Sequence, residues 1–197
     1  MAATKSFTSQ LAVLFKIAGA LSEGGALASV SEAPEMVSQV LQGHQAIAGL
    51  AERMEHISDI YVLGRGIHYA IASEASLKLK ELAYIHAEAL PGGELKHGPL
   101  ALLDSNSQVI LLNPSDSTHR DLLASGHEVK ARGAKLIGIS DRKSALYDEW
   151  IEIPRMPEEL FPLVEVVPTQ LLSYYLAVRR NGNPDYPRNL AKSVTVK

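Results

Sequence analysis

The 197-residue chain has no cysteine, which excludes a disulfide scaffold, a cysteine-based zinc site and a cysteine nucleophile. An excess of one charge is also missing. The formal net charge is -3, so neither nucleic acid nor an anionic membrane is expected as the main partner. The apolar stretches are interrupted before membrane-spanning length, and the N-terminus lacks the basic-then-apolar layout of a signal peptide. These absences fit a cytoplasmic protein.

What is present is an ordinary globular composition. Apolar residues make up 46% of the chain and charged residues 21%, which predicts a packed core rather than disorder. A length of 197 residues suits one domain with some additional segments.

Hydrophobic periodicity predicts helices that alternate with short strands. Helical spacing of apolar residues predicts helices over 4–22, 34–56, 70–84, 119–133 and 158–180, with Pro162 and Pro168 delimiting or kinking the last. Apolar β-rich runs predict strands over 59–66, 107–113, 134–140 and 149–154. Strand runs without clean alternation, separated by helices, indicate an α/β fold with a doubly wound parallel sheet flanked by helices.

Two predicted loops fall where such a sheet binds ligands, at the carboxyl ends of its strands. GRG at 64–66 is too short for a dinucleotide fingerprint, because the third glycine is absent. NPSDSTHRD at 113–121 could hold a phosphate on hydroxyl and N–H groups. The simpler interpretation, an N-cap by Ser117 or Thr118, is favoured because Asp116 would repel phosphate. The scattered histidines indicate no metal site, and no cofactor is expected.

A stripe of charge lies on the predicted helix before residue 84. Glu74, Lys78 and Glu81 are spaced i, i+4 and i+7, so they share one face. The simpler interpretation, which spacing alone favours, is a solvated face with weak ion pairs. The alternative makes Glu81 a carboxylate base that Lys78 keeps charged and oriented.

The stretch GELKHGP at 93–99 places His97 among loop residues that include Gly98 and Pro99. A lone histidine in a loop is more often structural or exposed than catalytic. Here the glycines allow close approach of the backbone to a ligand, and an imidazole titrates near neutral pH. His97 is therefore a candidate for proton transfer.

Four segments together carry a family resemblance. GRG at 64–66, EASLKLKELAYIHAEAL at 74–90, GELKHGPLALLD at 93–104 and PRNLAKSVTV at 187–196 closely resemble the isomerase half of the glucosamine-6-phosphate synthase family. That family makes glucosamine 6-phosphate from fructose 6-phosphate and glutamine, on the route of amino sugar metabolism to UDP-N-acetylglucosamine. The resemblance implies a sugar-isomerase (SIS) domain, a three-layer flavodoxin-like fold, in a cytoplasmic homodimeric transferase.

The resemblance also implies roles for single residues. Glu81 would be the base that moves a proton between C1 and C2 of the sugar. His97 would assist ring opening, reaching the site of a neighbouring subunit. Lys192 would contact the open-chain sugar or form an imine with it, although without the resemblance a mobile, exposed tail is the simpler interpretation. Lys78 and Glu74 would support the base and the substrate.

The first residues match the family with one departure. ATKSFTSQL at 3–11 resembles the helix that closes the first SIS domain of the family, where Thr4 would help to bind substrate. Ala3 stands where the family usually has serine, so one hydroxyl is missing. The glutaminase domain and most of the first SIS domain have no counterpart in the sequence.

These matches predict a leading helix at 1–25, an SIS domain at 26–180 and a catalytic tail at 181–197. The expected activity is the isomerase part of an aminotransferase acting on fructose 6-phosphate. The alternatives are a non-catalytic SIS module that binds a phosphosugar and a standalone SIS isomerase completed by dimerisation. Self-association is expected, since the leading helix has an apolar face without its own domain.

Overall fold

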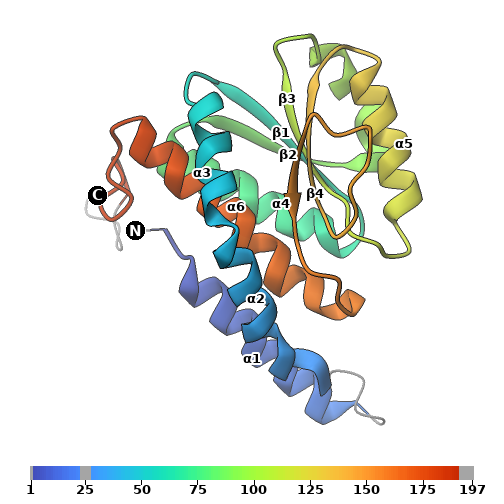
Figure 1. Ribbon diagram of the computed structural model, residues 1–197, viewed down its shortest axis with the longest axis vertical. Helices are drawn as coiled ribbons and strands as arrows, with labels where there is room; N and C mark the ends of the chain where they lie inside the picture. The colour runs from blue at the N-terminus through green and yellow to red at the C-terminus, as the bar shows by residue number, and fades with distance from the viewer. Residues whose placement is uncertain (1, 23–27, 191–197) are drawn as a thin grey trace, which may run out of the picture.

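A computed structural model describes residues 2–22 and 28–190, which are drawn in colour in Figure 1. Its centre is a sheet of five parallel strands in the order β2-β1-β3-β4-β5. The strands are β1 Asp59–Gly64, β2 His86–Pro91, β3 Gln108–Leu112, β4 Lys135–Ser140 and β5 Glu149–Glu152. This order reverses direction between β1 and β3, as in doubly wound sheets of the flavodoxin type. The predicted fold class is confirmed.

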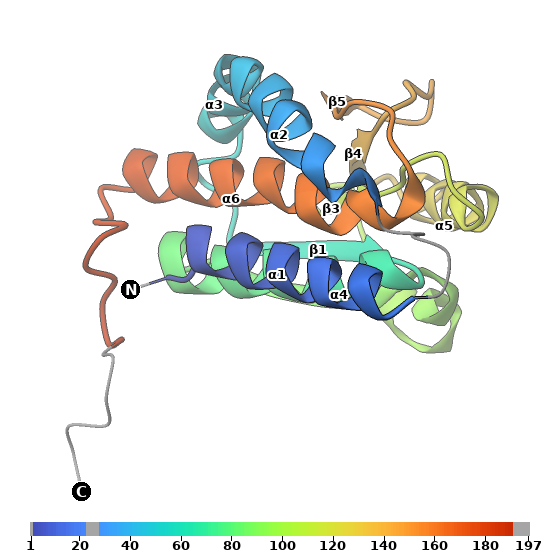
Figure 2. The same ribbon diagram turned by 90° about the horizontal axis from the view of Figure 1, so that it is seen from below.

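Six α-helices accompany the strands in the described chain. They are α1 Lys5–Leu21, α2 Ala33–Gln42, α3 His44–Arg53, α4 Ile67–Lys78, α5 His119–Lys130 and α6 Phe161–Arg179. Short helical segments lie between them: η1 Ala28–Glu32, η2 Leu79–Ala83, η3 Gly92–His97, η4 Pro99–Leu102 and η5 Glu158–Leu160. Helices α2, α3, α4 and α6 gather on one side of the sheet and α5 on the other, as Figures 1 and 2 show.

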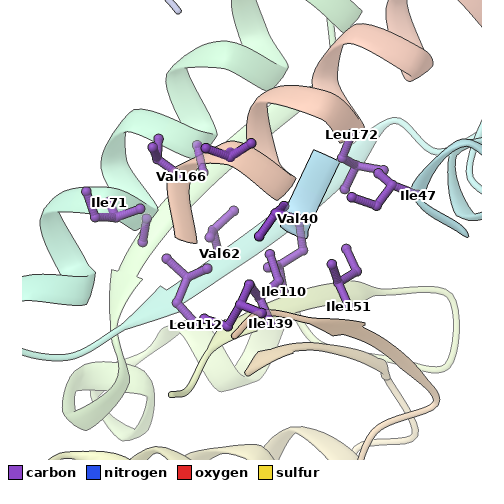
Figure 3. Close-up of a cluster of buried hydrophobic side chains, with 14 of the residues drawn as sticks. Val40, Ile47, Val62, Ile71, Ile110, Leu112, Ile139, Ile151, Val166 and Leu172 are labelled. Atoms are coloured by element: carbon purple, nitrogen blue, oxygen red, sulfur yellow. The ribbon is translucent and has the colours of Figure 1, made fainter. Parts of the chain in front are cut away.

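The strands are buried on both faces because their apolar side chains point alternately to two cores. Val62, Ile110 and Ile139 pack with the side chains of α3, α4 and α6, as Figure 3 shows. Leu63 and Leu111 pack on the opposite face with the apolar residues of α5. This two-sided burial explains the continuous apolar runs by which the strands are recognised in the sequence.

Three elements differ from the sequence prediction. The helix predicted over 34–56 is two helices, because Gly43 ends α2 with a tight turn from its N–H to the Val40 carbonyl. Strand β2 was not predicted. It is an edge strand with exposed and buried residues mixed, and so lacks an apolar run. The helix predicted over 70–84 begins earlier, at Ile67, and changes its winding after Lys78.

The stretch Glu158–Arg179 is long and apolar enough in composition to span a membrane, contrary to the expectation from the interrupted apolar runs. However, 72% of its most apolar 18-residue segment is buried inside the fold. Helix α6 packs against α2, α3 and α4, so it is a core helix of the domain.

The two ends of the sheet carry different segments. Helix α4 runs back from the carboxyl end of β1, so η2 lies at the amino end of the strands. Helix α6 ends on the same side, and its continuation over 181–190 lies near the start of α1 in both views (Figures 1 and 2). Segment η3 follows β2 and therefore lies at the carboxyl end.

Candidate functional site

The charged stripe of α4 and η2 forms a compact set of ion pairs. Lys78 Nζ lies 2.7 Å from Glu81 Oε2 and 3.2 Å from Glu74 Oε1. The Lys78 side chain is only 2% exposed, whereas those of Glu74 and Glu81 are 12% and 22% exposed. The interpretation as a solvated face is therefore wrong for the lysine. Its ammonium lies under two carboxylates that open toward solvent.

Burial acts on the two carboxylates unequally. Desolvation raises the pKa of Glu74, and the nearby Lys78 ammonium only partly offsets this effect. Only one of the two contacts has good hydrogen-bond geometry, that from Lys78 to Glu81. Lys78 thus directs its strongest contact at the more exposed carboxylate, as expected for a group that keeps a base charged and oriented.

A change of helical winding places Glu81. Residues Leu79–Ala83 form a π-helix, which ends when Tyr84 adopts a left-handed conformation (φ 56°) and donates its N–H to the Leu79 carbonyl. One wide turn rotates the side chains that follow it, and such turns are frequent at functional sites. Lys78 and Glu81, three residues apart, meet across this turn.

The C-terminal tail is anchored beside Glu81. The Arg188 N–H donates to Tyr84 Oη at 2.8 Å, and the Arg188 guanidinium lies 4.1 Å from the centre of the Tyr84 ring. A shallow pocket of about 380 Å³ lies between η2 and the tail, lined by Leu77, Lys80, Glu81, Tyr84, Arg188, Asn189 and Leu190. Lys192 lies outside the described residues, two positions beyond Leu190.

The residues at the start of α1 occupy the same end of the molecule. Thr4 precedes the helix and accepts the Thr8 N–H at 3.2 Å through its carbonyl, while its side chain makes no capping hydrogen bond. Ala3 is exposed. The Thr4 hydroxyl is therefore not used to begin the helix.

His97 does not join this group. It ends η3 at the carboxyl end of the sheet, and the whole length of β2 separates it from η2. Its side chain is 74% exposed, with Nε2 4.0 Å from the exposed Glu94 carboxylate. The structure thus brings Glu74, Lys78 and Glu81 together and places His97 at the opposite end of the sheet.

Sequence reasoning missed a set of buried ionisable residues. His68 hydrogen-bonds through Nδ1 with Glu165 Oε1 at 2.7 Å and through Nε2 with Asp116 Oδ2 at 2.7 Å. The side chains of His68 and Glu165 are 0% exposed and that of Asp116 is 1% exposed. One signal was available, because Glu165 is the only charge in the apolar run FPLVEVVP, and an isolated charge in a buried helix needs a partner.

The loop over 113–118 serves this buried set. Thr118 precedes α5 as predicted, but its side chain makes no capping bond. Its N–H and hydroxyl both donate to Asp116 Oδ1 at 2.8 Å. Both oxygens of Asp116 are thereby engaged, one with His68 and the other with Thr118.

The geometry at the amino end of the strands suits proton transfer. A carboxylate oriented by a buried ammonium can abstract a proton from carbon and return it to a neighbouring carbon. A pocket between that carboxylate and the tail gives a small polar molecule access to both.

Comparisons with known proteins show the family of the chain. Residues 54–180 match the model of the SIS domain. The chain is 45% identical over its full length to the glutamine–fructose-6-phosphate aminotransferase (isomerizing) of Thermococcus kodakarensis, and it spans 35% of that protein. It is likewise 44% identical to the aminotransferase of the same name from Xylella fastidiosa, again spanning 35% of it. The chain thus covers about a third of the length of these relatives.

Solved structures give the same result. The C-terminal domain of the glucosamine-fructose-6-phosphate aminotransferase of Francisella tularensis matches with a TM-score of 0.83 and 34% identity, covering 93% of this chain and 56% of that one. A glucosamine-6-phosphate deaminase of Thermotoga maritima, at 24% identity and a TM-score of 0.71, shares the fold. The chain belongs to the SIS domain family, and its similarity to the isomerizing glutamine–fructose-6-phosphate aminotransferases extends over its whole length.

Proposed function

We propose that the chain is the isomerase part of an aminotransferase that converts fructose 6-phosphate and ammonia to glucosamine 6-phosphate. The observation that carries the proposal is the buried Lys78 ammonium directed at the partly exposed Glu81 carboxylate beside the anchored tail. The names of the relatives support the choice of substrate. Ammonia would come from glutamine through a glutaminase domain outside these residues.

The chemistry assigns one step to each group. Amination of a 2-ketose requires ring opening, attack of ammonia at C2, loss of water and a proton shift between C1 and C2. Glu81 would abstract and return that proton, since one carboxylate can reach both carbons. Lys192 would bind the open-chain carbonyl or form an imine with it, because a desolvated lysine amine is a nucleophile. Glu74 would support Lys78, and Thr4 would bind the sugar phosphate beside Ala3.

His97 enters the proposal through a second subunit. Glu81 precedes β2 and lies at the amino end of the strands, whereas His97 follows β2 and lies at the carboxyl end. One chain therefore does not bring the two residues into one site. The exposed His97 side chain is free to reach a neighbouring copy, where it would assist ring opening. A homodimer would thus combine Glu81 of one copy with His97 of the other.

The division of the chain follows from these roles. Residues 1–25 would be a leading helix that belongs to a preceding SIS domain, 26–180 the SIS domain and 181–197 the catalytic tail. A cytoplasmic location is part of the proposal, in keeping with the absence of cysteine. No nucleic acid or membrane partner is proposed.

The test is a nuclear magnetic resonance assay of fructose 6-phosphate with the protein and a high concentration of ammonium. Formation of glucosamine 6-phosphate or glucose 6-phosphate that is lost in Glu81→Gln would support the proposal. A matched control is Glu88→Gln, which changes an exposed carboxylate of β2 and should leave the rate unchanged.

The alternative, a non-catalytic module that binds a phosphosugar, predicts a different result. Fructose 6-phosphate would then perturb the spectra of the protein without conversion, and Glu81→Gln would change nothing but affinity. The buried ion pairs of Lys78 favour the catalytic proposal, since binding alone does not require an oriented carboxylate.

A further inference from the structure

Three ionisable side chains meet inside the domain without taking part in the proposed reaction. The His68 ring lies between two carboxylates, with Glu165 on one nitrogen and Asp116 on the other, each at 2.7 Å. All three side chains are at least 99% buried. The ring of Phe161, 5.9 Å away, covers another side of the imidazole. We call these three residues the His68 triad.

The triad joins three elements at the reversal point of the sheet. His68 lies in the first turn of α4 after β1, Asp116 in the loop after β3, and Glu165 in α6. The crevice between the carboxyl ends of β1 and β3 is the usual ligand site of doubly wound sheets. Here the contacts of His68 with Asp116 and Glu165 cross this crevice. The crevice therefore holds buried side chains that connect three elements, and it is not an open ligand site.

The geometry of the triad suits a charged imidazole between two carboxylates. Ionised carboxylates only accept hydrogen bonds, and an imidazole donates from both nitrogens only as the cation. Burial alone would lower the pKa of His68, but the hydrogen bonds and charges of Glu165 and Asp116 outweigh it and raise the pKa. These two carboxylates are the charged groups that face the ring, one from α6 and one from the β3–α5 loop.

The contacts of Asp116 extend to the start of helix α5. The other Asp116 oxygen accepts the Thr118 N–H and hydroxyl at 2.8 Å, immediately before α5 begins. The next turns of α5 contact η3, the segment that ends in His97. The Ser125 hydroxyl donates to the Gly92 carbonyl at 2.8 Å, and Lys96 Nζ lies 3.0 Å from Glu128 Oε1.

Packing supports the same connection. Leu95 of η3 is 1% exposed and shares an apolar cluster with Leu122 of α5. A side chain at Gly92 would lie 2.8 Å from Leu122, so the segment is in direct contact with the helix. The position of η3 therefore depends on where α5 begins.

We propose that His68, held as a cation between Glu165 and Asp116, is a positioning residue that fixes α5 and, through it, the segment carrying His97. The inference rests on the proposed function in one respect, the role of His97 in sugar ring opening. It assigns to the triad the alignment of the one proposed catalytic residue that lies far from Glu81.

The test measures amide hydrogen exchange of the intact chain by mass spectrometry. In His68→Gln, exchange over 92–97 and 118–130 should rise about tenfold, while exchange over 79–83 stays unchanged. His56→Gln is the matched control, because the His56 side chain is 92% exposed and should alter neither region. Unchanged exchange over 92–97 in a folded His68→Gln protein would overturn the proposal.

Asp116→Asn keeps the experiment decisive should His68→Gln not fold. The amide oxygen can still accept from Thr118, but the charge that faces His68 is gone. This variant should also loosen 92–97, and a rise confined to residues outside 92–97 and 118–130 would contradict the proposal.

A pH series separates positioning by a charged His68 from a purely steric role. In the unaltered chain, exchange over 92–97, corrected for intrinsic rates, should increase as pH rises through the elevated pKa of His68. In His68→Gln it should not vary with pH. If exchange over 92–97 in the unaltered chain did not vary with pH, the proposal that a charged His68 fixes α5 would be overturned. These readouts need no turnover, so a failed conversion assay would leave this test intact.

Discussion

At the scale of single residues, burial separates two lysines that are neighbours on α4 and η2. The Lys78 side chain is 2% exposed and contacts two carboxylates, whereas Lys80 is exposed. Removing a buried charge leaves its partners uncompensated, while an exposed charge is stabilised by water. The same substitution should therefore have different costs at the two positions.

Lys78→Met should lower the free energy of unfolding by about 3 kcal/mol, because two half-buried carboxylates then repel each other without a cation. Urea unfolding at neutral pH measures the loss, and Lys80→Met is the control with the same change of side chain. Equal losses in the two variants would mean that the ion pairs of Lys78 do not stabilise the fold.

The His68 triad gives stability a pH dependence on the alkaline side. The pKa of His68 is raised in the folded chain, so the folded state binds this proton more tightly than the unfolded state, in which the histidine has a pKa of 6.5. This contribution is complete below pH 6.5 and is lost as pH rises through the folded pKa. The raised pKa of Glu165, which burial causes, acts in the same direction.

An acid limb should accompany the alkaline one. Burial alone would raise the pKa of Asp148, but its bonds to Lys130 and to the Leu136 N–H lower it overall. The stability that it contributes is present above pH 3.8 and is lost as pH falls through the lower folded pKa. Unfolding curves across pH should show both limbs, with His68→Gln weakening the alkaline one and Asp148→Asn weakening the acid one.

How much of the site could be predicted depends on the range of the interaction. The stripe of Glu74, Lys78 and Glu81 follows from helical spacing, and the structure joins them as ion pairs. The burial of Lys78 does not follow from that spacing, since α4 packs against α6, which is far away in sequence. The partners of His68 lie 48 and 97 residues away, and no local pattern specifies such a contact.

At the scale of elements, the tail is held through one aromatic ring. Tyr84 accepts the Arg188 N–H and lies under its guanidinium, and its left-handed conformation ends the π-helix. The anchor places the last described residues beside Glu81. Lys192 is a short distance further along the chain, so a firm anchor would serve the proposed imine chemistry.

Tyr84→Phe should free the tail while retaining the ring. Losing one net hydrogen bond of about 1 kcal/mol should make cleavage after Arg188 by trypsin about fivefold faster. Tyr186→Phe is the matched control, since that residue is 82% exposed. Equal cleavage rates in both variants would show that the tail is not anchored at Tyr84.

Local sequence predicts elements well where one side chain pattern decides them. The strands β1, β3 and β4 were found because burial on both faces leaves an apolar run. Strand β2 was missed because it lies at the edge of the sheet, where pairing with β1 determines the strand and no apolar run marks it in the sequence. The π-helical turn at Leu79–Ala83 has no signal in composition, and its residues pack against α6, which is far away in sequence.

At the scale of the whole molecule, the sheet separates the two proposed catalytic groups. Glu81 lies at the amino end of the strands and His97 at the carboxyl end. The predicted homodimer also has an apolar surface available, because α1 exposes Val13, Leu14 and Ile17. A site made from both groups therefore requires two copies.

Mixing two inactive variants tests this arrangement. Equal amounts of Glu81→Gln and His97→Asn should recover about one quarter of the unaltered activity after subunit exchange, because half the dimers are mixed and one of their two sites is intact. Sedimentation of the same samples should show self-association. A clean monomer at high concentration, or no recovery from variants that exchange subunits, would contradict a shared site.

The His68 triad has a consequence for the history of the sequence. Losing any one of its members leaves an unpaired charge or an unsatisfied donor in the interior, and that intermediate is costly. Positions 68, 116 and 165 should thus be inherited as a unit, so that related sequences carry either all three ionisable residues or an uncharged combination of similar volume. Far apart along the chain, they should vary together as if they were neighbours.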